Sequence, residues 1–441
     1  MSARSPRPGR GSGRGTRAPT RSAFDRVLEV RLADRPVPLV VGRLAQRGHD
    51  ILFEYDDAFI PTGLVLSPLG LPLRAGVQQE TTRIFHGLHG LFHDSLPDGW
   101  GLRLMDREFS RRGFDPATVT PVERLQFLGT RPMGGLTYHP AADAQGPAPR
   151  IDLDVLGAQA ERVYEGSPEE VLPALVKAGG SAAGARPKVL VAWNTDSGEM
   201  RSGAEDVAPG FKPYLVKFPT KEDGADVGAV EMAYAAMARA AGIDMPATHL
   251  FSTDGGRRCF GVERFDRVHT GKTAEHRHVH TLGGLLHASH REVGCTYSHF
   301  LRATARLTHD HREVLEAFRR MVFNVLAWNR DDHVRNFAFL MEPSGTWRLA
   351  PAYDLVYSPG PGGEHSMMVG TEGARPTYQN FLQVAAPEGL TPRDVADIVE
   401  RAAESVLRWP AYAVEYGVAP ATTEKINASI QRACADGMIR V

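Results

Sequence analysis

The segment from His311 to Gly360 restricts the possible folds of this chain more than any other part of the sequence. In its first half, apolar residues return every three or four positions, which predicts a long helix with one buried face. A polar cluster, NRDDHVRN, begins where this spacing ends. The apolar residues of the predicted helix are Val314, Leu315, Phe318, Met321, Val322, Val325 and Leu326. A core helix therefore delivers a group of polar side chains at its C-terminal end, near Asn329.

Two short strands are predicted directly after this polar cluster. The sequences NFAFLM and TWRLA are rich in apolar and aromatic residues, and the Pro-Ser-Gly stretch between them favours a turn. The second strand leads into AYDLV, in which Asp354 stands among apolar neighbours. A hairpin of this kind returns the chain toward the end of the helix, so we expect Asp331, Asn336 and Asp354 to lie close together.

The spacing Asp331-x-x-x-x-Asn336 is that of the protein-kinase catalytic loop, in which Asp accepts the proton of the attacking hydroxyl and Asn holds magnesium. Asp354 would supply the second metal-binding acid. Phosphoryl transfer depends on positioning and charge neutralisation, and oxygen ligands of this kind suit Mg²⁺. Two alternatives stay open from the residues alone. The spacing also occurs by chance in surface loops, and Asp332 leaves the register open by one residue.

A lysine lies inside a predicted apolar strand further upstream. Lys217 stands between Val216 and Phe218 in YLVKFPT, and a buried ammonium group requires a partner or a ligand. Phosphate oxygens would suit it. Glu231, fourteen residues later on a predicted Ala-rich helix, is the available carboxylate for an ion pair that orients the lysine, as helix αC does in kinases. The alternative for Glu231 is an ordinary exposed acid on a helix.

A Gly-rich turn precedes the lysine strand. In GGSAAGARPK (179–188), the glycines Gly179, Gly180 and Gly184 allow backbone N–H groups to approach phosphates closely. The segment matches neither the Walker A pattern, because no GK[ST] follows Gly184, nor GxGxxG. A P-loop or a Rossmann site is therefore disfavoured.

The chain divides into a tail and three predicted units of mixed α and β structure. Residues 1–23 are made of Arg, Gly, Ser and Pro, which predicts a disordered tail that is either a solvated extension or a weak contact for nucleic acid. Residues 24–140 form an α+β unit, and residues 141–270 begin with a Pro/Gly-rich linker and follow the element order of a kinase small lobe. Residues 271–441 are mainly helical by their period.

Composition excludes several classes of protein. The chain has 441 residues and a formal net charge of −1. Its residues are 42% hydrophobic and 23% charged, which are fractions typical of globular proteins. No run of about 18 apolar residues predicts a membrane span. Three widely spaced cysteines form neither a disulfide framework nor a CxxC motif, which favours a reducing cytosol. The alternating histidines His276, His278 and His280 have no nearby Cys or carboxylate set to complete a zinc site.

Five motifs in a fixed order carry a resemblance to a known family. They are GGSAAGARPK, YLVKFPT, GVERFDR, NRDDHVRNF and APAYDLV, and the segments LSPLGLPL and LPDGWG precede them. Together they resemble the HipA family of serine/threonine kinase toxins from bacterial type II toxin–antitoxin modules, over about residues 25–435. The resemblance implies an α+β, two-lobed protein-kinase-like fold with an N-terminal β-rich subdomain. It also implies ATP and Mg²⁺ as cofactors and a cytosolic protein as substrate, with aminoacyl-tRNA synthetases as the best-known target class.

The same resemblance implies partners for the protein, and two alternative functions remain beside that of a kinase toxin. A small HipB-like helix-turn-helix antitoxin would restrain the toxin and tie the pair to operator DNA, and no membrane is involved. The alternatives are a pseudokinase that serves as a corepressor binding module, and a small-molecule or lipid kinase. Because Lys217, Asp331, Asn336 and Asp354 are all present, the sequence favours an active enzyme.

Residue roles follow from matching these motifs. Asp331 becomes the catalytic residue, and Asn336 and Asp354 become magnesium ligands. In VERFDR, Glu263 and Phe265 would meet adenine through the backbone, and Asp266 would reach ribose. Ser181 matches the serine that such kinases autophosphorylate. The implied ATP-binding residues are Ser181, Ala182, Gly184, Ala185, Lys188, Lys217, Glu263, Phe265, Asp266 and His333, with Glu231 in support. Arg330 departs from the family pattern, in which a small polar residue commonly precedes the catalytic Asp, and so does the Arg-rich tail.

Overall fold

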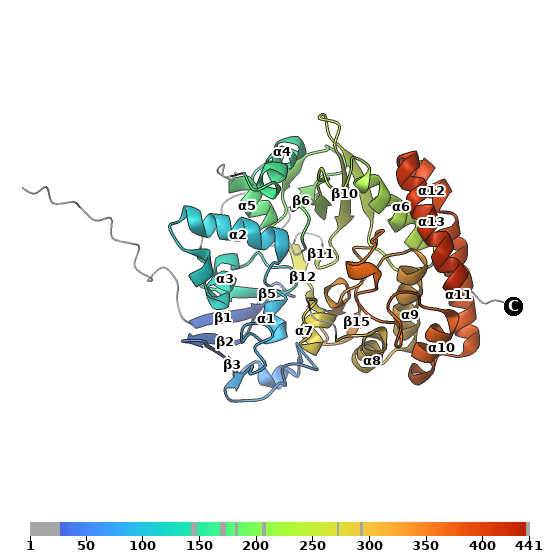
Figure 1. The fold of residues 1–441 in the computed structure, drawn as a ribbon. Helices are drawn as coiled ribbons and strands as arrows, with labels where there is room; N and C mark the ends of the chain where they lie inside the picture. The colour runs from blue at the N-terminus through green and yellow to red at the C-terminus, as the bar shows by residue number, and fades with distance from the viewer. Residues whose placement is uncertain are drawn as a thin grey trace, which may run out of the picture.

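The computed structural model describes residues 27–142, 148–167, 173–180, 184–204, 209–270, 273–291 and 294–437. The predicted tail, Ser181 and Ala182 lie outside the described residues. Three parts are visible: an N-terminal β-rich subdomain, a small lobe built on a second sheet, and a mainly helical large lobe (Figure 1). The α+β, two-lobed fold with an N-terminal β-rich subdomain is therefore confirmed.

The N-terminal subdomain is an antiparallel sheet with the strand order β4-β3-β2-β1-β5. Strands β1 and β3 alternate buried and more exposed residues, as a sheet with one covered face requires. In β1, for example, Leu28, Val30 and Leu32 are fully buried. The strands are β1 (Val27–Leu32), β2 (Leu39–Arg47), β3 (Asp50–Tyr55), β4 (Gln78–Gln79) and β5 (Leu136–His139), and the helices are α1 (Gly90–His93), α2 (Gly99–Arg111) and α3 (Pro121–Leu128).

The small lobe is a five-stranded antiparallel sheet with the order β7-β6-β8-β10-β9. Alternate residues of β10 belong to different clusters: Cys259 packs with α4 and α5, whereas Phe260 packs with α6, so helices cover both faces. The strands are β6 (Lys188–Trp193), β7 (Met200–Ser202), β8 (Lys212–Lys217), β9 (Thr248–Ser252) and β10 (Arg258–Glu263); the helices are α4 (Leu153–Tyr164), α5 (Pro173–Gly179) and α6 (Val227–Ala240).

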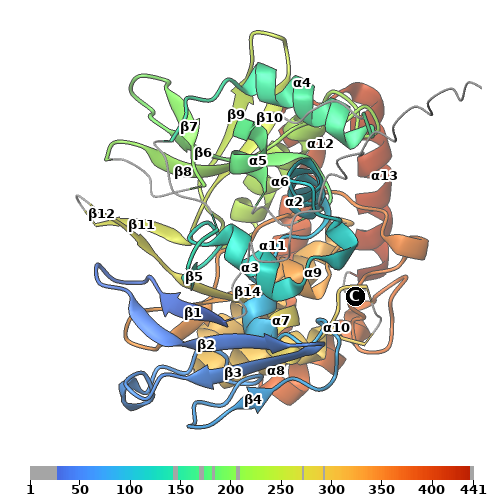
Figure 2. The same cartoon turned by 90° about the vertical axis from the view of Figure 1, so that its left-hand side faces the viewer.

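The large lobe follows the hairpin of β11 (Arg267–Thr270) and β12 (Thr273–His276), which lies between the two sheets (Figure 2). A three-stranded sheet joins β13 (His278–Thr281), β14 (Ala338–Met341) and β15 (Trp347–Leu349). The central helix is α9 (His311–Leu326), which packs against α8 (Tyr297–Thr308), α11 (Pro392–Leu407) and α13 (Pro420–Gly437). The remaining helices are α7 (Leu282–Leu286), α10 (Tyr378–Ala385) and α12 (Trp409–Tyr416). Among the described helices, none is both long and apolar enough to cross a bilayer.

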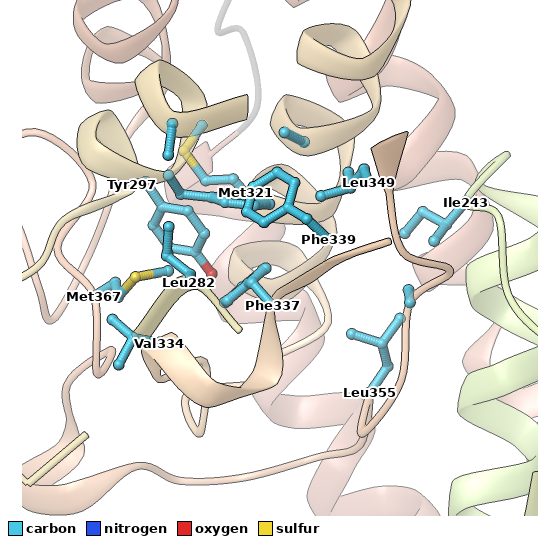
Figure 3. Close-up of a cluster of buried hydrophobic side chains, with 14 of the residues drawn as sticks. Ile243, Leu282, Tyr297, Met321, Val334, Phe337, Phe339, Leu349, Leu355 and Met367 are labelled. Atoms are coloured by element: carbon cyan, nitrogen blue, oxygen red, sulfur yellow. The ribbon is translucent and has the colours of Figure 1, made fainter. Parts of the chain in front are cut away.

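One buried cluster anchors the polar segment that follows α9. Val334 and Phe337 are almost fully buried, and they lie beside Tyr297, Leu282 and other apolar side chains of the large lobe (Figure 3). Val334 is the first residue of a short 3₁₀ helix, η3 (Val334–Asn336), and Phe337 follows its last residue. Because both ends of η3 are packed into the core, the polar residues around it are held in fixed positions.

The alternating histidines connect the N-terminal subdomain to the large lobe. On β13, His280 contacts Asp94 through Nδ1 at 2.6 Å and Ser67 through Nε2 at 2.9 Å. His278 Nε2 lies 2.9 Å from the carbonyl of Leu66. Ser67 and Leu66 come from the LSPLGLPL segment, so hydrogen bonds rather than a metal account for these buried rings.

A second histidine cluster lies nearby and consists of Glu80, His89 and His287. The N–H of Gly90 donates to Nε2 of His287 at 2.9 Å, so in the neutral ring the proton is on Nδ1. That Nδ1 faces Oε2 of Glu80 at 3.3 Å. A metal ion would need the Nδ1 lone pair that this proton occupies, so the cluster is better described as a polar contact between the N-terminal subdomain and the large lobe.

Replacing Asp94 by alanine should weaken the contact between the N-terminal subdomain and the large lobe. Its carboxylate accepts hydrogen bonds from His280, from the N–H of Thr281 at 2.7 Å and from the Thr281 hydroxyl at 2.8 Å. Because buried donors would lose their partner, we expect the free energy of unfolding to fall by roughly 2 to 4 kcal/mol in urea denaturation. Asp50→Ala is the control, since Asp50 is 53% exposed and should change stability by less than about 1 kcal/mol. Equal effects of the two changes would contradict the interpretation.

Candidate active site

Strand alternation places two lysines on the same face of the small-lobe sheet. Val189 and Val216 pack toward α4 and α5, so their neighbours Lys188 and Lys217 face the other side, which α6 covers. The two lysines are also directly opposite each other in the β6–β8 pairing. Two adjacent buried cations on one face favour an anionic ligand.

Lys217 is the centre of a buried ion-pair group. Its Nζ donates to a carboxylate oxygen of Glu231 on α6 and to Oδ1 of Asp354 at 2.5 Å. Lys217 and Glu231 are 12% and 9% exposed, whereas Asp354 is 32% exposed and can still meet a ligand. The ion pair predicted between Lys217 and Glu231 is present, so Glu231 is not an ordinary surface acid.

The charges of this group shift its titration. Burial alone would lower the pKa of Lys217, but the carboxylates of Asp354 and Glu231 outweigh burial and raise it. The positive charge of Lys217 holds the pKa of Asp354 well below its usual range, against the opposing effect of burial. At neutral pH, Lys217 is therefore protonated and Asp354 is ionised.

Asp331 and Asn336 lie in the loop that the core cluster anchors. The side-chain amide of Asn336 donates to the carbonyl of Asp331 at 2.7 Å, which leaves the amide oxygen as an acceptor. The Asp331 side chain is 56% exposed. Partial burial raises the pKa of Asp331, and the nearby carboxylates of Asp354 and Asp332 raise it further, while His333 lowers it. A carboxylate with a raised pKa is suited to accept a proton.

His333 caps η3 from the same loop. Its Nδ1 accepts the N–H of Arg335 at 3.2 Å, so the proton of the neutral ring is on Nε2. That nitrogen lies 3.9 Å from Oδ1 of Asp331. His333 therefore stands beside the candidate proton acceptor.

Asp332 has a different environment from Asp331. Its buried carboxylate accepts hydrogen bonds from the Tyr297 hydroxyl at 2.5 Å, from His365 Nδ1 at 2.7 Å and from the N–H of Ser366 at 2.8 Å. The side chain is 0% exposed. These contacts make Asp332 a structural residue and assign the exposed position in the loop to Asp331.

The described end of the Gly-rich turn lies over Lys188. A Cβ added to Gly184, which has φ +95°, would lie 2.3 Å from the Lys188 Nζ. The Lys188 ammonium group is thus directly beneath the backbone at Gly184, the residue before Ala185, and burial lowers the pKa of Lys188. Ser181 and Ala182, which precede this point, belong to the part of the chain that the structure does not describe.

The crossing between the lobes contains Glu263 at the end of β10 and Phe265 two residues later. Phe265 packs against Tyr353, with ring centroids 5.7 Å apart, and Tyr353 directly precedes Asp354. Phe265, which is predicted to meet adenine through its backbone, therefore contacts the residue directly before the candidate metal ligand Asp354.

The ribose role predicted for Asp266 is not supported. Its side chain is 2% exposed and is paired with Arg264 and Arg267, each at 2.8 Å, and it also accepts the N–H of Gly134 at 2.8 Å. These contacts hold its pKa below the usual range although burial opposes them. Asp266 therefore fastens the crossing between the lobes to the N-terminal subdomain.

Asp98 connects both lobes, and the sequence did not single it out. The N–H of Gly184 donates to one carboxylate oxygen of Asp98, and Arg335 of η3 lies 3.0 Å from the other. Trp100 adds hydrogen bonds to the carbonyls of Gly184 and Lys188, at 2.9 and 2.8 Å. The sequence signal at this position is the LPDGWG segment, and its composition predicts neither contact of Asp98.

The fold and the site define a two-lobed, kinase-like protein with an added N-terminal subdomain. The chain matches the family models of the HipA-like C-terminal domain over residues 180–409 and of the HipA N-terminal domain over residues 28–139. It therefore belongs to the HipA family.

The HipA chain in a complex of HipA, HipB and operator DNA from Shewanella oneidensis has the same fold. The TM-score is 0.69 at 17% sequence identity, and the match covers 93% of this chain and 96% of that chain. Two curated proteins also match and are named "Putative kinase" (Haemophilus influenzae) and "Putative kinase Y4dM" (Sinorhizobium fredii). They are 28% identical over 32% of this chain and 25% identical over 43% of it. The matches span 44% and 46% of those two proteins, less than half of their length.

Proposed function

We propose that this protein is an ATP-dependent serine/threonine protein kinase. The observation that carries the proposal is the group formed by Lys217, Glu231 and Asp354, with Asp331 and Asn336 beside it. Kinases use this combination of a paired lysine, a catalytic carboxylate and two oxygen ligands for phosphoryl transfer. The names of the two curated relatives also support the proposal.

In this proposal each residue has one role. Asp331 accepts the proton of the acceptor hydroxyl while the oxygen of that hydroxyl bonds to the γ-phosphorus and the bond from phosphorus to the bridging oxygen of ADP breaks. Lys217, oriented by Glu231, contacts phosphate oxygens, and Lys188 adds a second positive charge under the Gly-rich turn. The backbone of Glu263 and Phe265 meets adenine, and His333 lies beside the phosphates.

The donor set suits a magnesium ion. Asn336 offers an amide oxygen because its amide nitrogen is engaged with the Asp331 carbonyl, and Asp354 offers an ionised and partly exposed carboxylate. Oxygen atoms of these two kinds are the ligands that Mg²⁺ takes in proteins. A bound Mg²⁺ would neutralise charge on the phosphates of ATP.

The test is phosphate incorporation by the purified chain. With labelled ATP and Mg²⁺, we expect phosphate to appear on the protein itself or on an added acceptor, and EDTA should abolish the signal because the metal ligands would be empty. Intact mass and peptide mapping should find one added phosphate at Ser181. A chain that binds ATP but transfers no phosphate under any metal condition would leave the pseudokinase as the better description.

The biological role that we propose is that of a toxin. Its substrate would be a cytosolic protein, possible targets including an aminoacyl-tRNA synthetase, and a HipB-like helix-turn-helix antitoxin would restrain it and link it to operator DNA. The complex of HipA, HipB and operator DNA from Shewanella oneidensis supports this assembly. Expression of the chain alone should arrest bacterial growth. Arrest that persists when phosphate transfer is abolished would favour the corepressor alternative.

A further inference from the structure

Arg330, the residue before Asp331, holds a distant part of the chain. One of its terminal nitrogens donates to the carbonyl of Gly363, and the other donates to the carbonyl of Ala374 at 2.6 Å. The guanidinium group also lies over the ring of Trp328, 3.8 Å from its centroid. Arg330 is buried, so these contacts are protected from water. Both carbonyls belong to the segment 355–376, which follows Asp354.

The backbone of the catalytic loop binds the same segment. The N–H of Arg330 donates to the carbonyl of Ser358 at 3.2 Å, and the hydroxyl of Ser366 donates to the carbonyl of Arg330 at 3.0 Å. On the other side of Asp331, the carboxylate of Asp332 binds His365 and the N–H of Ser366. Asp331 is therefore flanked by two residues that both fasten the segment 355–376.

The segment is shaped to fit this contact. Gly360 has φ +73°, and a Cβ at this position would lie 2.2 Å from the Glu364 carbonyl and 2.6 Å from the Arg330 Cβ. Only glycine permits both the backbone conformation and this close approach. Gly363, whose carbonyl accepts from Arg330, also has a positive φ, at +82°.

In protein kinases, the segment after the metal-binding Asp is commonly ordered when an arginine pairs with a phosphate group on it. Here an arginine in the corresponding place pairs with two backbone carbonyls instead. We propose that Arg330 is a positioning residue that keeps the segment 355–376 ordered without a phosphate group, so that a protein acceptor can approach Asp331. The approach of a protein acceptor to Asp331 rests on the proposed kinase function, whereas the ordering of the segment by Arg330 does not.

The planar fork of arginine is needed for this contact. Two carbonyls from residues eleven positions apart are reached by two nitrogens of one guanidinium group, while its flat face lies on Trp328. A lysine would keep the positive charge but offers one nitrogen and no flat face. Arg330→Lys should therefore behave like Arg330→Met, which distinguishes the geometry of the contact from its charge.

The first arm of the test is hydrogen exchange of the full-length protein without ATP. In Arg330→Met and Arg330→Lys, we expect amides in the segment 355–376 to exchange about ten- to a hundredfold faster than in the wild type, because two charge-assisted hydrogen bonds are lost. Arg432→Met is the matched control: the Arg432 guanidinium lies 5.8 Å from the centroid of the same Trp328 ring, and we expect its loss to leave the exchange of the segment unchanged. Phosphatase treatment of the wild type should also leave it unchanged.

Two outcomes of this arm overturn the ordering role. One is exchange of the segment in Arg330→Met within about twofold of the wild type. The other is faster exchange of the segment in the wild type after phosphatase treatment, since a phosphate group, and not the carbonyl contacts of Arg330, would then order the segment. Faster exchange over the whole large lobe would mean a general loss of packing and would also count against a positioning role.

The second arm measures transfer to dephosphorylated casein as a probe acceptor. A positioning role predicts that Arg330→Met raises the KM for casein about tenfold while the KM for ATP stays within about twofold. If the segment 355–376 exchanges faster in Arg330→Met but the KM for casein is unchanged, the proposed role of the segment in the approach of a protein acceptor is wrong. If the wild type itself transfers no phosphate, the kinase function fails, and the exchange arm still decides whether Arg330 orders the segment.

Discussion

Replacing Asp331 by asparagine should lower the rate of phosphate transfer by about 10²- to 10⁴-fold, the usual contribution of a general base. Asparagine has the same shape but cannot accept the proton of the acceptor hydroxyl. Because the side chain is 56% exposed and makes no buried hydrogen bond among the described residues, the thermal stability of the variant should stay close to that of the wild type. A radiolabel transfer assay and a melting curve on the same preparation measure both quantities.

Asp332→Asn provides the matched control one residue away. Its carboxylate has three buried partners, and an amide cannot accept from all of them, so the free energy of unfolding should fall by about 1 to 3 kcal/mol. The folded fraction should keep far more activity than Asp331→Asn does. If instead Asp332→Asn abolishes transfer and Asp331→Asn does not, the assignment of the two aspartates is wrong.

Replacing Lys217 by methionine should have the second large effect, on both stability and activity. The change removes the cation that pairs with both Glu231 and Asp354, and it leaves a buried carboxylate and a partly exposed carboxylate without their shared partner. Removing one partner of a buried ion pair typically costs roughly 3 to 5 kcal/mol, and we expect a loss near 3 kcal/mol because Asp354 is partly exposed. The KM for ATP should rise and kcat should fall together, since in the proposed kinase function the lysine contacts phosphates in the ground state and during transfer.

The pH dependence of this variant has a definite sign. In the wild type, the depressed pKa of Asp354 means that its stabilising contribution is present above about pH 4 and is lost as the pH falls through the lower, folded-state pKa. In Lys217→Met the two carboxylates raise each other's pKa, so they take up protons as the pH falls from 7 toward 5. Urea denaturation should therefore show a smaller gap between variant and wild type at pH 5 than at pH 7.

An exposed lysine serves as the comparison. Lys221 is 72% exposed and pairs with Glu165, so Lys221→Met should leave the free energy of unfolding close to that of the wild type at either pH. The interpretation of Lys217 as a phosphate contact would be wrong if the folded fraction of Lys217→Met transferred phosphate at the wild-type rate.

The ion pair at Lys217 could be predicted because its causes are local. A lysine inside an apolar strand needs a partner, and the helix that follows offers one acid on its packed side. The grouping of Asp331, Asn336 and Asp354 was also predictable, because one helix and one hairpin bring them together within 24 positions. Periodicity and turn chemistry carry this kind of information.

Contacts between remote segments could not be predicted in the same way. Asp98 meets Gly184 and Arg335 from 86 and more positions away, and no periodicity marks such a pairing. The ribose role of Asp266 was inferred from its motif, but the motif does not reveal that Arg264 and Arg267 enclose its carboxylate. The roles of Ser181 and Ala182 stay predictions, because these residues lie outside the described part of the chain.

The Asp98 contacts also set a limit on how the two lobes can move. Two lobes joined by a single crossing can rotate apart about that crossing as a hinge. Here the N-terminal subdomain carries a carboxylate that touches Gly184 of one lobe and Arg335 of the other. Any rotation that increases the distance between Gly184 and Arg335 has to break at least one of these contacts. The N-terminal subdomain thus bridges the two lobes through Asp98, and the lobes can move apart at this point only when one of its two contacts is released.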